Sequence, residues 1–110
     1  MGTVACALIT SNNLIFKGVC IDTSSGMGFC AEHTAISQMI TQREYQIQKI
    51  VALKQDNNGL TSILPACGRC RELMYQINNS NIETQIIIGE NKIVQLKDIL
   101  TLYNISENIN

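Results

Sequence analysis

The chain has 110 residues, 45% of them hydrophobic, so it suits one domain with a core and is too short for two. Its 8 basic and 9 acidic residues give a net charge of -1, with no basic stripe of the kind that nucleic-acid binding requires. No apolar run approaches the length of a membrane span, and the run at 4–9 is too short for a signal peptide. We therefore expect a cytoplasmic protein that binds a small molecule and neither nucleic acid nor membranes.

The first half of the chain predicts a hairpin followed by a helix and a strand. Residues 4–10 and 14–21 have strand character and are joined by an Asn-rich turn, since Asn tolerates positive φ. A loop rich in Ser, Thr and Gly follows at 22–28. Helical spacing of apolar residues predicts a helix from Cys30 to about Gln42, and 47–53 predicts a third strand.

The second half repeats the alternation of helix and strand. A turn at 56–59 precedes Pro65, which cannot lie inside a helix, so the next helix is expected from Ala66 or Cys67 to about Ile77. Residues 82–89 give the strongest strand signal, and a short segment at 93–94 leads to a last helix from about Leu96 to Tyr103. This order predicts an α/β domain with a mixed sheet over residues 1–104 and a frayed tail at 105–110.

Three of the five cysteines have the spacing of a metal site. In a reducing compartment a Cys-x-x-Cys more often binds metal or does redox work than forms a disulfide. Cys30, Cys67 and Cys70 supply the three ligands of a catalytic zinc, which keeps its fourth position for water. Two helix N-termini would favour the thiolates. The remaining negative charge needs a nearby cation, and the candidates are His33, Arg69 and Arg71.

Glu32 stands two residues after Cys30, in the same predicted helical turn. From there its carboxylate can reach the open position of the metal. A carboxylate beside a zinc-activated water is placed to accept a proton and return it to a leaving group. Glu32 is therefore the candidate catalytic residue of a hydrolytic reaction.

Two segments together resemble the cytidine deaminase family, including its blasticidin-S deaminase relatives. They are residues 30–36 (Cys-Ala-Glu-His-Thr-Ala-Ile) and 65–72 (Pro-Ala-Cys-Gly-Arg-Cys-Arg-Glu), which carry the zinc deaminase pattern of His or Cys, x-Glu and a later Pro-Cys-x-x-Cys. The resemblance extends from Val4 to about Tyr103. It implies a three-layer α/β/α domain with a mixed sheet of about five strands and a bound Zn²⁺. It also implies hydrolysis of cytidine or deoxycytidine to the uracil nucleoside and ammonia in pyrimidine salvage, by a homo-oligomer, a tetramer or dimer.

The positions that would bind the substrate depart from the family. Cys20-Ile21-Asp22 stands in place of an Asn-x-Glu that binds the ribose. Asp22 can still accept a sugar hydroxyl, but Cys20 cannot replace an amide. The resemblance also assigns Ala31 and Pro65 to the substrate site, although Ala66 intervenes between Pro65 and the second zinc cysteine.

Two further departures leave alternatives open. His33 replaces the Arg that many members use to bond the thiolates, and the family's first helix, upstream of Met1, is expected to be absent. The alternatives are a deaminase of another amino-heterocycle, or a catalytically silent zinc-binding domain that acts through assembly. The cysteines also have two simpler interpretations. One is a structural zinc with Cys6 or Cys20 as a fourth ligand, and the other is a set of ordinary buried thiols.

Overall fold

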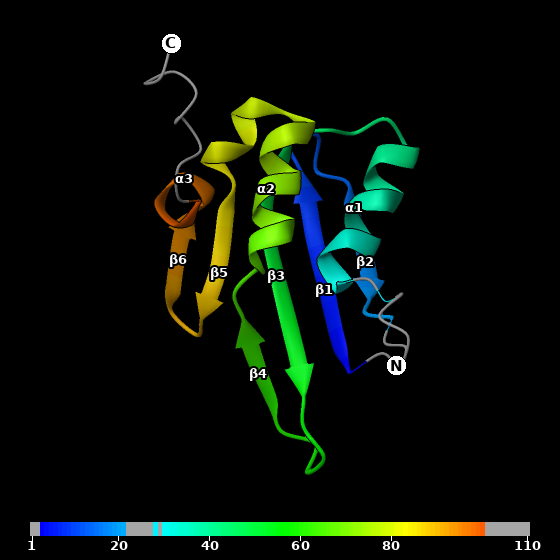
Figure 1. The fold of residues 1–110 in the computed structure, drawn as a ribbon, viewed down its shortest axis with the longest axis vertical. Helices are drawn as coiled ribbons and strands as arrows, with labels where there is room; N and C mark the ends of the chain where they lie inside the picture. The colour runs from blue at the N-terminus through cyan, green and yellow to red at the C-terminus, as the bar shows by residue number, and fades with distance from the viewer. Residues whose placement is uncertain (1–2, 22–27, 29, 101–110) are drawn as a thin grey trace.

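The computed structural model describes residues 3–21, 28 and 30–100, which form one mixed sheet with helices packed on it (Figure 1). The strands are β1 (Val4–Thr10), β2 (Ile15–Val19), β3 (Ile47–Gln55), β4 (Thr61–Leu64), β5 (Gln85–Gly89) and β6 (Lys92–Gln95). The helices are α1 (Ala31–Thr41), α2 (Gly68–Ile77), the 3₁₀ helix η1 (Asn79–Glu83) and α3 (Leu96–Ile99). No helix of this described part is long and apolar enough to cross a membrane.

The sheet has the order β2-β1-β3-β5-β6, and β4 pairs with the C-terminal half of β3, from Ala52 to Gln55. Among the described strands, β3 and β5 form the one parallel pair, and the other pairs are antiparallel. The predicted α/β class and mixed sheet are therefore confirmed, with six strands where about five were expected. The extra strand is β4, which forms a hairpin with β3.

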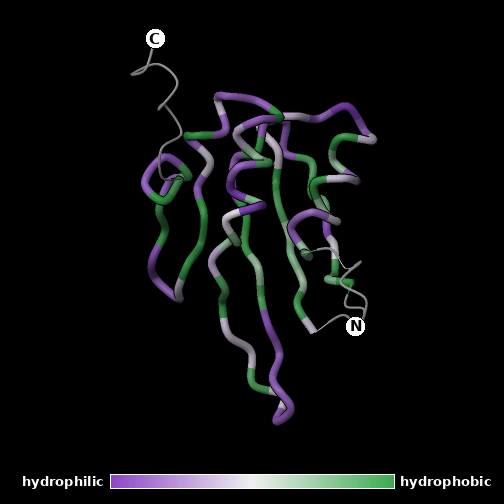
Figure 2. Tube along the Cα trace, viewed as in Figure 1, coloured by the Kyte–Doolittle hydropathy of each residue, from purple (hydrophilic) through white to green (hydrophobic). Residues whose placement is uncertain are grey.

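The β3–β4 hairpin depends on its turn. The Asp56 side chain accepts hydrogen bonds from the backbone N–H groups of Asn58 and Leu60, both at 2.9 Å. Gly59 has φ of 79°, which a glycine adopts without strain. The tip of this hairpin is the hydrophilic segment at the bottom of the molecule (Figure 2). Four residues with only two apolar side chains give little strand signal, so β4 was not predicted.

The strand predicted at 82–89 begins later, at Gln85, because η1 precedes it. Asn78 caps η1 by accepting a bond from the Ser80 N–H at 2.9 Å. The side chain of Asn81, fully buried, bonds the carbonyls of Tyr45 and Met74 and the N–H of Ile47. Asn81 thus ties the end of α2 to the start of β3. The last helix, α3, ends at Ile99 within the described residues, whereas its predicted end at Tyr103 lies outside them.

Helices α1 and α2 cover the same face of the sheet (Figure 1). Alternate residues of β1 point toward them, and Cys6 and Leu8 are buried in the core. On the opposite face, antiparallel register aligns Val19, Ala5, Leu53 and Ile63 in one row across four strands. Val19 is 50% exposed and Leu53 38%, so this row presents apolar side chains at the surface.

Gly18 of β2 allows α1 to lie directly against the sheet. A Cβ built on Gly18 would lie 2.5 Å from the N of Ala35, 2.8 Å from the carbonyl oxygen of Ala31 and 2.8 Å from Cβ of Thr34. Two of these three atoms belong to the backbone, which cannot rotate away. Because Gly18 has no side chain, the first turns of α1 can lie directly against the sheet.

We expect Gly18→Ala to lower the free energy of unfolding by about 2–3 kcal/mol, because α1 must shift to admit the methyl group. Denaturant unfolding monitored by circular dichroism measures the change. Gly89→Ala is the matched control, since the nearest atom to its new Cβ would be Cβ of Lys92 at an ordinary 3.6 Å. Equal stability of the two variants would contradict the close approach at Gly18.

Candidate metal centre

The candidate metal centre lies where the N-termini of α1 and α2 meet. Cys30 and Cys67 are the N-cap residues of these helices, and each has extended backbone angles. Neither helix has a side-chain cap bond at this end. Each thiol therefore lies beside helix N–H groups that have no partner within the helix, and the positive ends of two helix dipoles favour negative charge here.

The three predicted ligands come together. The sulfurs of Cys30, Cys67 and Cys70 all lie within 4.8 Å of one another, and the Cys30 and Cys67 sulfurs are 3.4 Å apart. A tetrahedral zinc with Zn–S bonds of about 2.3 Å needs sulfurs about 3.8 Å apart, which falls between these values. Cys70 is fully buried, Cys30 half-buried and Cys67 exposed. These residues fit a zinc ion, and they form a three-thiol site.

The thiols differ in their readiness to ionise. Burial raises the pKa of Cys70 strongly, and hydrogen bonding to Cys67 and the Cys67 charge raise it further. Burial also raises the pKa of Cys30, as does its bond to Cys67. Burial acts in the same direction on Cys67, but hydrogen bonds from the Cys70 backbone and from the Cys30 and Cys70 thiols outweigh it, so the pKa of Cys67 is lowered. Binding of a dication requires the thiolate forms and therefore competes with protons at this cluster, most strongly at Cys30 and Cys70, whose pKa values are raised.

Glu32 lies within electrostatic reach of all three sulfurs. It is on the first turn of α1 and only 5% exposed. The negative charge of Glu32 acts to raise the pKa of each of the three thiols, although burial is the larger cause and the net shift of Cys67 is downward. A buried carboxylate thus faces the cluster from the same helical turn as Cys30.

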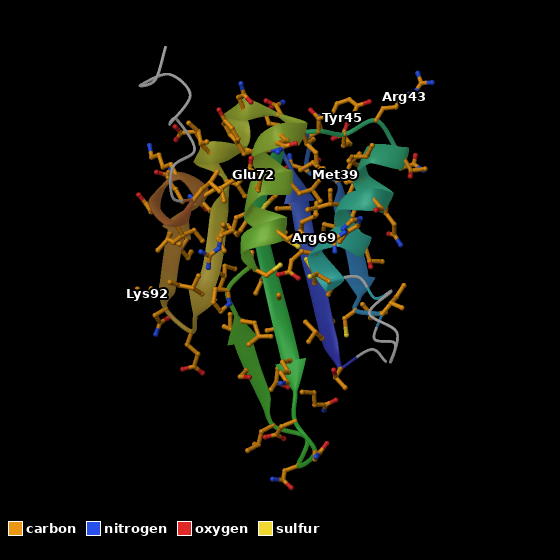
Figure 3. All side chains as sticks on the ribbon, in the orientation of Figure 1. Met39, Arg43, Tyr45, Arg69, Glu72 and Lys92 are labelled. Carbon is orange, nitrogen blue, oxygen red and sulfur yellow. The ribbon has the colours of Figure 1, made fainter. Side chains whose placement is uncertain are left out.

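Three cations were candidates to offset the thiolates. His33 is half-buried on the first turn of α1, and its Nδ1 is buried. Arg69 is exposed at the start of α2 (Figure 3). Arg71 is half-buried, and its Nε donates to the carbonyl of Ala66 at 2.7 Å while Nη1 donates to the carbonyl of Ile99 at 3.0 Å. These two bonds of the Arg71 guanidinium thus go to main-chain oxygens.

The predicted substrate-binding residues are spread around this centre. Ala31 is buried and adjoins Cys30, while Pro65 is exposed between β4 and α2. Cys20 is buried just after β2, where its sulfur lies 4.0 Å from Oγ1 of Thr3 and its N–H donates to the carbonyl of Val4. Asp22 lies outside the described residues.

Cys6 and Cys20 are buried core thiols, as their places on predicted strands indicated. Burial, and after it the Glu32 charge, raises the pKa of Cys6 to about 12. Among the described residues, neither Cys6 nor Cys20 belongs to the candidate metal cluster, so a fourth thiol ligand has no support there. One feature of the site was not predicted, the bond from Arg71 to Ile99, because 28 residues separate the two.

The fold and the three-thiol centre define a class of α/β domain built around a zinc site. Residues 1–87 match the family model of the cytidine and deoxycytidylate deaminase zinc-binding region, and the chain belongs to this family. A cytidine deaminase of Mycoplasma genitalium is 34% identical over 77 residues, which are 69% of this chain and 56% of the relative. The chain thus spans little more than half the length of that relative.

Solved structures agree with this assignment. The crystal structure of cytidine deaminase from Mycobacterium leprae has a TM-score of 0.73 and 25% identity, over 89% of this chain and 77% of that one. The cytidine deaminase from Bacillus anthracis has a TM-score of 0.78 over 96% of this chain and 76% of that one. At 20% identity, the second likeness supports the fold alone.

We expect Cys70→Ala to abolish stoichiometric zinc binding, because two thiols and water hold the ion far more weakly than three thiolates. Metal analysis after dialysis measures zinc per chain. Cys6→Ala is the matched control, since Cys6 is an equally buried thiol outside the cluster. Retention of one zinc by Cys70→Ala would remove Cys70 from the ligand set.

Proposed function

We propose that the protein is a zinc-dependent hydrolase that deaminates cytidine or deoxycytidine to the uracil nucleoside and ammonia. The observation that carries this proposal is the buried Glu32 beside three thiols whose sulfurs lie within 4.8 Å. Family membership supports the same reaction. Because only part of the relative is matched, the activity is our inference for this chain.

The chemistry divides between the metal and the protein. Cys30, Cys67 and Cys70 would hold the zinc, which would supply Lewis-acid activation of water. Glu32 would carry one proton of the attacking water to the ring nitrogen next to the amine-bearing carbon as the carbon–oxygen bond forms. Glu32 would then carry the second proton, from the new hydroxyl group, to the amine, so that the carbon–nitrogen bond breaks, the carbon becomes a carbonyl and ammonia leaves. His33 is the candidate to offset thiolate charge from the first turn of α1.

Recognition of the substrate is assigned to the rim of this centre. Ala31 directly follows Cys30 and Pro65 stands two residues before Cys67, and both are proposed to contact the base. Cys20 and Asp22 occupy the positions that would meet the sugar. The burial of Cys20 and its contact with Thr3 favour a second candidate, a deaminase of a different amino-heterocycle such as blasticidin S.

We also propose that the protein assembles as a homo-oligomer, a tetramer or dimer. We place it in the cytoplasm, where it would serve pyrimidine salvage without binding nucleic acid. The exposed apolar row of Val19, Ala5, Leu53 and Ile63 supports assembly, since monomers rarely leave such a face open. Ala5, Val19 and Leu53 of this row, together with Thr34 and Gln38 of α1, line a pocket of about 440 Å³. Light scattering is expected to give a mass of at least two chains, and a monomer at micromolar concentration would contradict assembly.

The decisive test is Glu32→Gln. We expect zinc to stay bound while deamination, followed as loss of the cytidine absorbance, slows by at least about 100-fold, because the amide cannot carry the proton. The wild type is assayed in parallel with cytidine, deoxycytidine and blasticidin S to identify the substrate class.

Glu72→Gln is the matched control, since Glu72 is an exposed carboxylate on α2 (Figure 3). Full activity of Glu32→Gln would remove Glu32 from catalysis. A zinc-loaded wild type that leaves all three compounds unchanged would overturn the proposed function and favour the silent, assembling domain.

A further inference from the structure

Arg71 joins three parts of the chain at the candidate metal centre. It follows the ligand Cys70 on the first turn of α2. Its backbone N–H donates to the carbonyl of Cys67 at 3.0 Å, and its Nε donates to the carbonyl of Ala66 at 2.7 Å. Nη1 reaches the carbonyl of Ile99 at 3.0 Å. One residue therefore holds two successive carbonyls of the ligand loop and one carbonyl of α3.

The bond to Ala66 matters because it holds the peptide that joins Ala66 to the candidate ligand Cys67. Pro65, the residue before Ala66, is exposed and has no backbone N–H to donate. Ala66 is only 3% exposed, and a buried carbonyl requires a donor. By satisfying this oxygen, Arg71 fixes the peptide that directly precedes Cys67 and so orients its thiol.

The bond to Ile99 connects the same loop to the end of α3. This helix has four residues, and a capping box between Gln95 and Asp98 holds its N-terminal end. Ile99 is the last residue of α3, so no N–H group of the helix can donate to its carbonyl oxygen. A positively charged group near this C-terminal carbonyl is favourable. Arg71 supplies that cation from α2.

We infer that Arg71 is a positioning residue that sets the geometry of Cys67 and couples the docking of α3 to zinc retention. This role differs from offsetting thiolate charge, because it requires the planar fork of a guanidinium to bond two carbonyls at once, which a lysine ammonium cannot reproduce. The inference rests on the zinc site of the proposed function.

The test compares Arg71→Lys and Arg71→Gln with Arg69→Gln, which removes an equal charge at the same sequence distance from Cys70. Zinc dissociation constants are measured by chelator competition. Amide hydrogen exchange of the metal-free proteins is followed at 66–70, at 96–100 and in β1 as the reference. Both Arg71 variants are expected to bind zinc at least about tenfold more weakly and to exchange faster at both segments, with β1 unchanged. Arg69→Gln is expected to alter zinc affinity by less than about threefold.

Wild-type affinity in Arg71→Lys, or an equal loss in Arg69→Gln, would overturn the inference and leave charge as the cause. If Arg71→Gln does not fold, the comparison of Arg71→Lys with the wild type decides. A wild type that binds zinc but does not deaminate would refute the proposed function and leave this inference standing. Unchanged exchange at 96–100 in Arg71→Lys would refute the coupling to α3.

Discussion

The contact of α1 with Gly18 is the constraint on which the rest of the site depends. Atoms of α1 lie within 2.5–2.8 Å of where a Gly18 side chain would begin, so only a glycine there lets the first turns of α1 lie against β2. Cys30 is the N-cap residue of α1 and Glu32 lies on its first turn, so the positions of one candidate ligand and of the proposed base depend on this close approach. Arg71 acts in a corresponding way on the second segment, through the carbonyls before and at Cys67. The candidate metal centre thus lies where the starts of two helices meet, and different contacts position each of these helix starts.

Gathering these groups has an electrostatic cost. Three thiols and one buried carboxylate share a small volume, and burial raises the pKa of Cys30 and Cys70. The helix N-termini offset part of the cost, and a dication offsets more. The carboxylate of Glu32 lies close to the three thiols. Its negative charge destabilises the metal-free protein, but the same position would place a base beside the metal. Stability and the proposed chemistry therefore oppose each other here, as is common at functional sites.

The local parts of this arrangement were predictable from the sequence. Helical spacing after Cys30, and Pro65 before the second cysteine pair, located α1 and α2 to within one or two residues. The Cys-x-x-Cys and Cys-x-Glu spacings predicted three thiols that the structure brings together. Contacts across the fold were not predictable. The role of Gly18 appears only when α1 lies on it, Arg71 finds Ile99 far along the chain, and η1 displaces the predicted strand start because Asn81 bonds three distant backbone groups.

This difference explains why the metal chemistry is better defined than the substrate. Proton transfer needs only groups fixed by short sequence spacing, whereas sugar recognition needs a polar group that arrives from another strand. At the position that we propose would meet the sugar, Cys20 offers a weak hydrogen-bonding thiol that is buried near Thr3. A site selects strongly for a substrate hydroxyl only when an analogue without that hydroxyl would leave a buried polar group of the protein unpaired. Cys20 leaves no such group, so on the proposed function the sugar contributes little selectivity through this position, and the choice of substrate depends on the base.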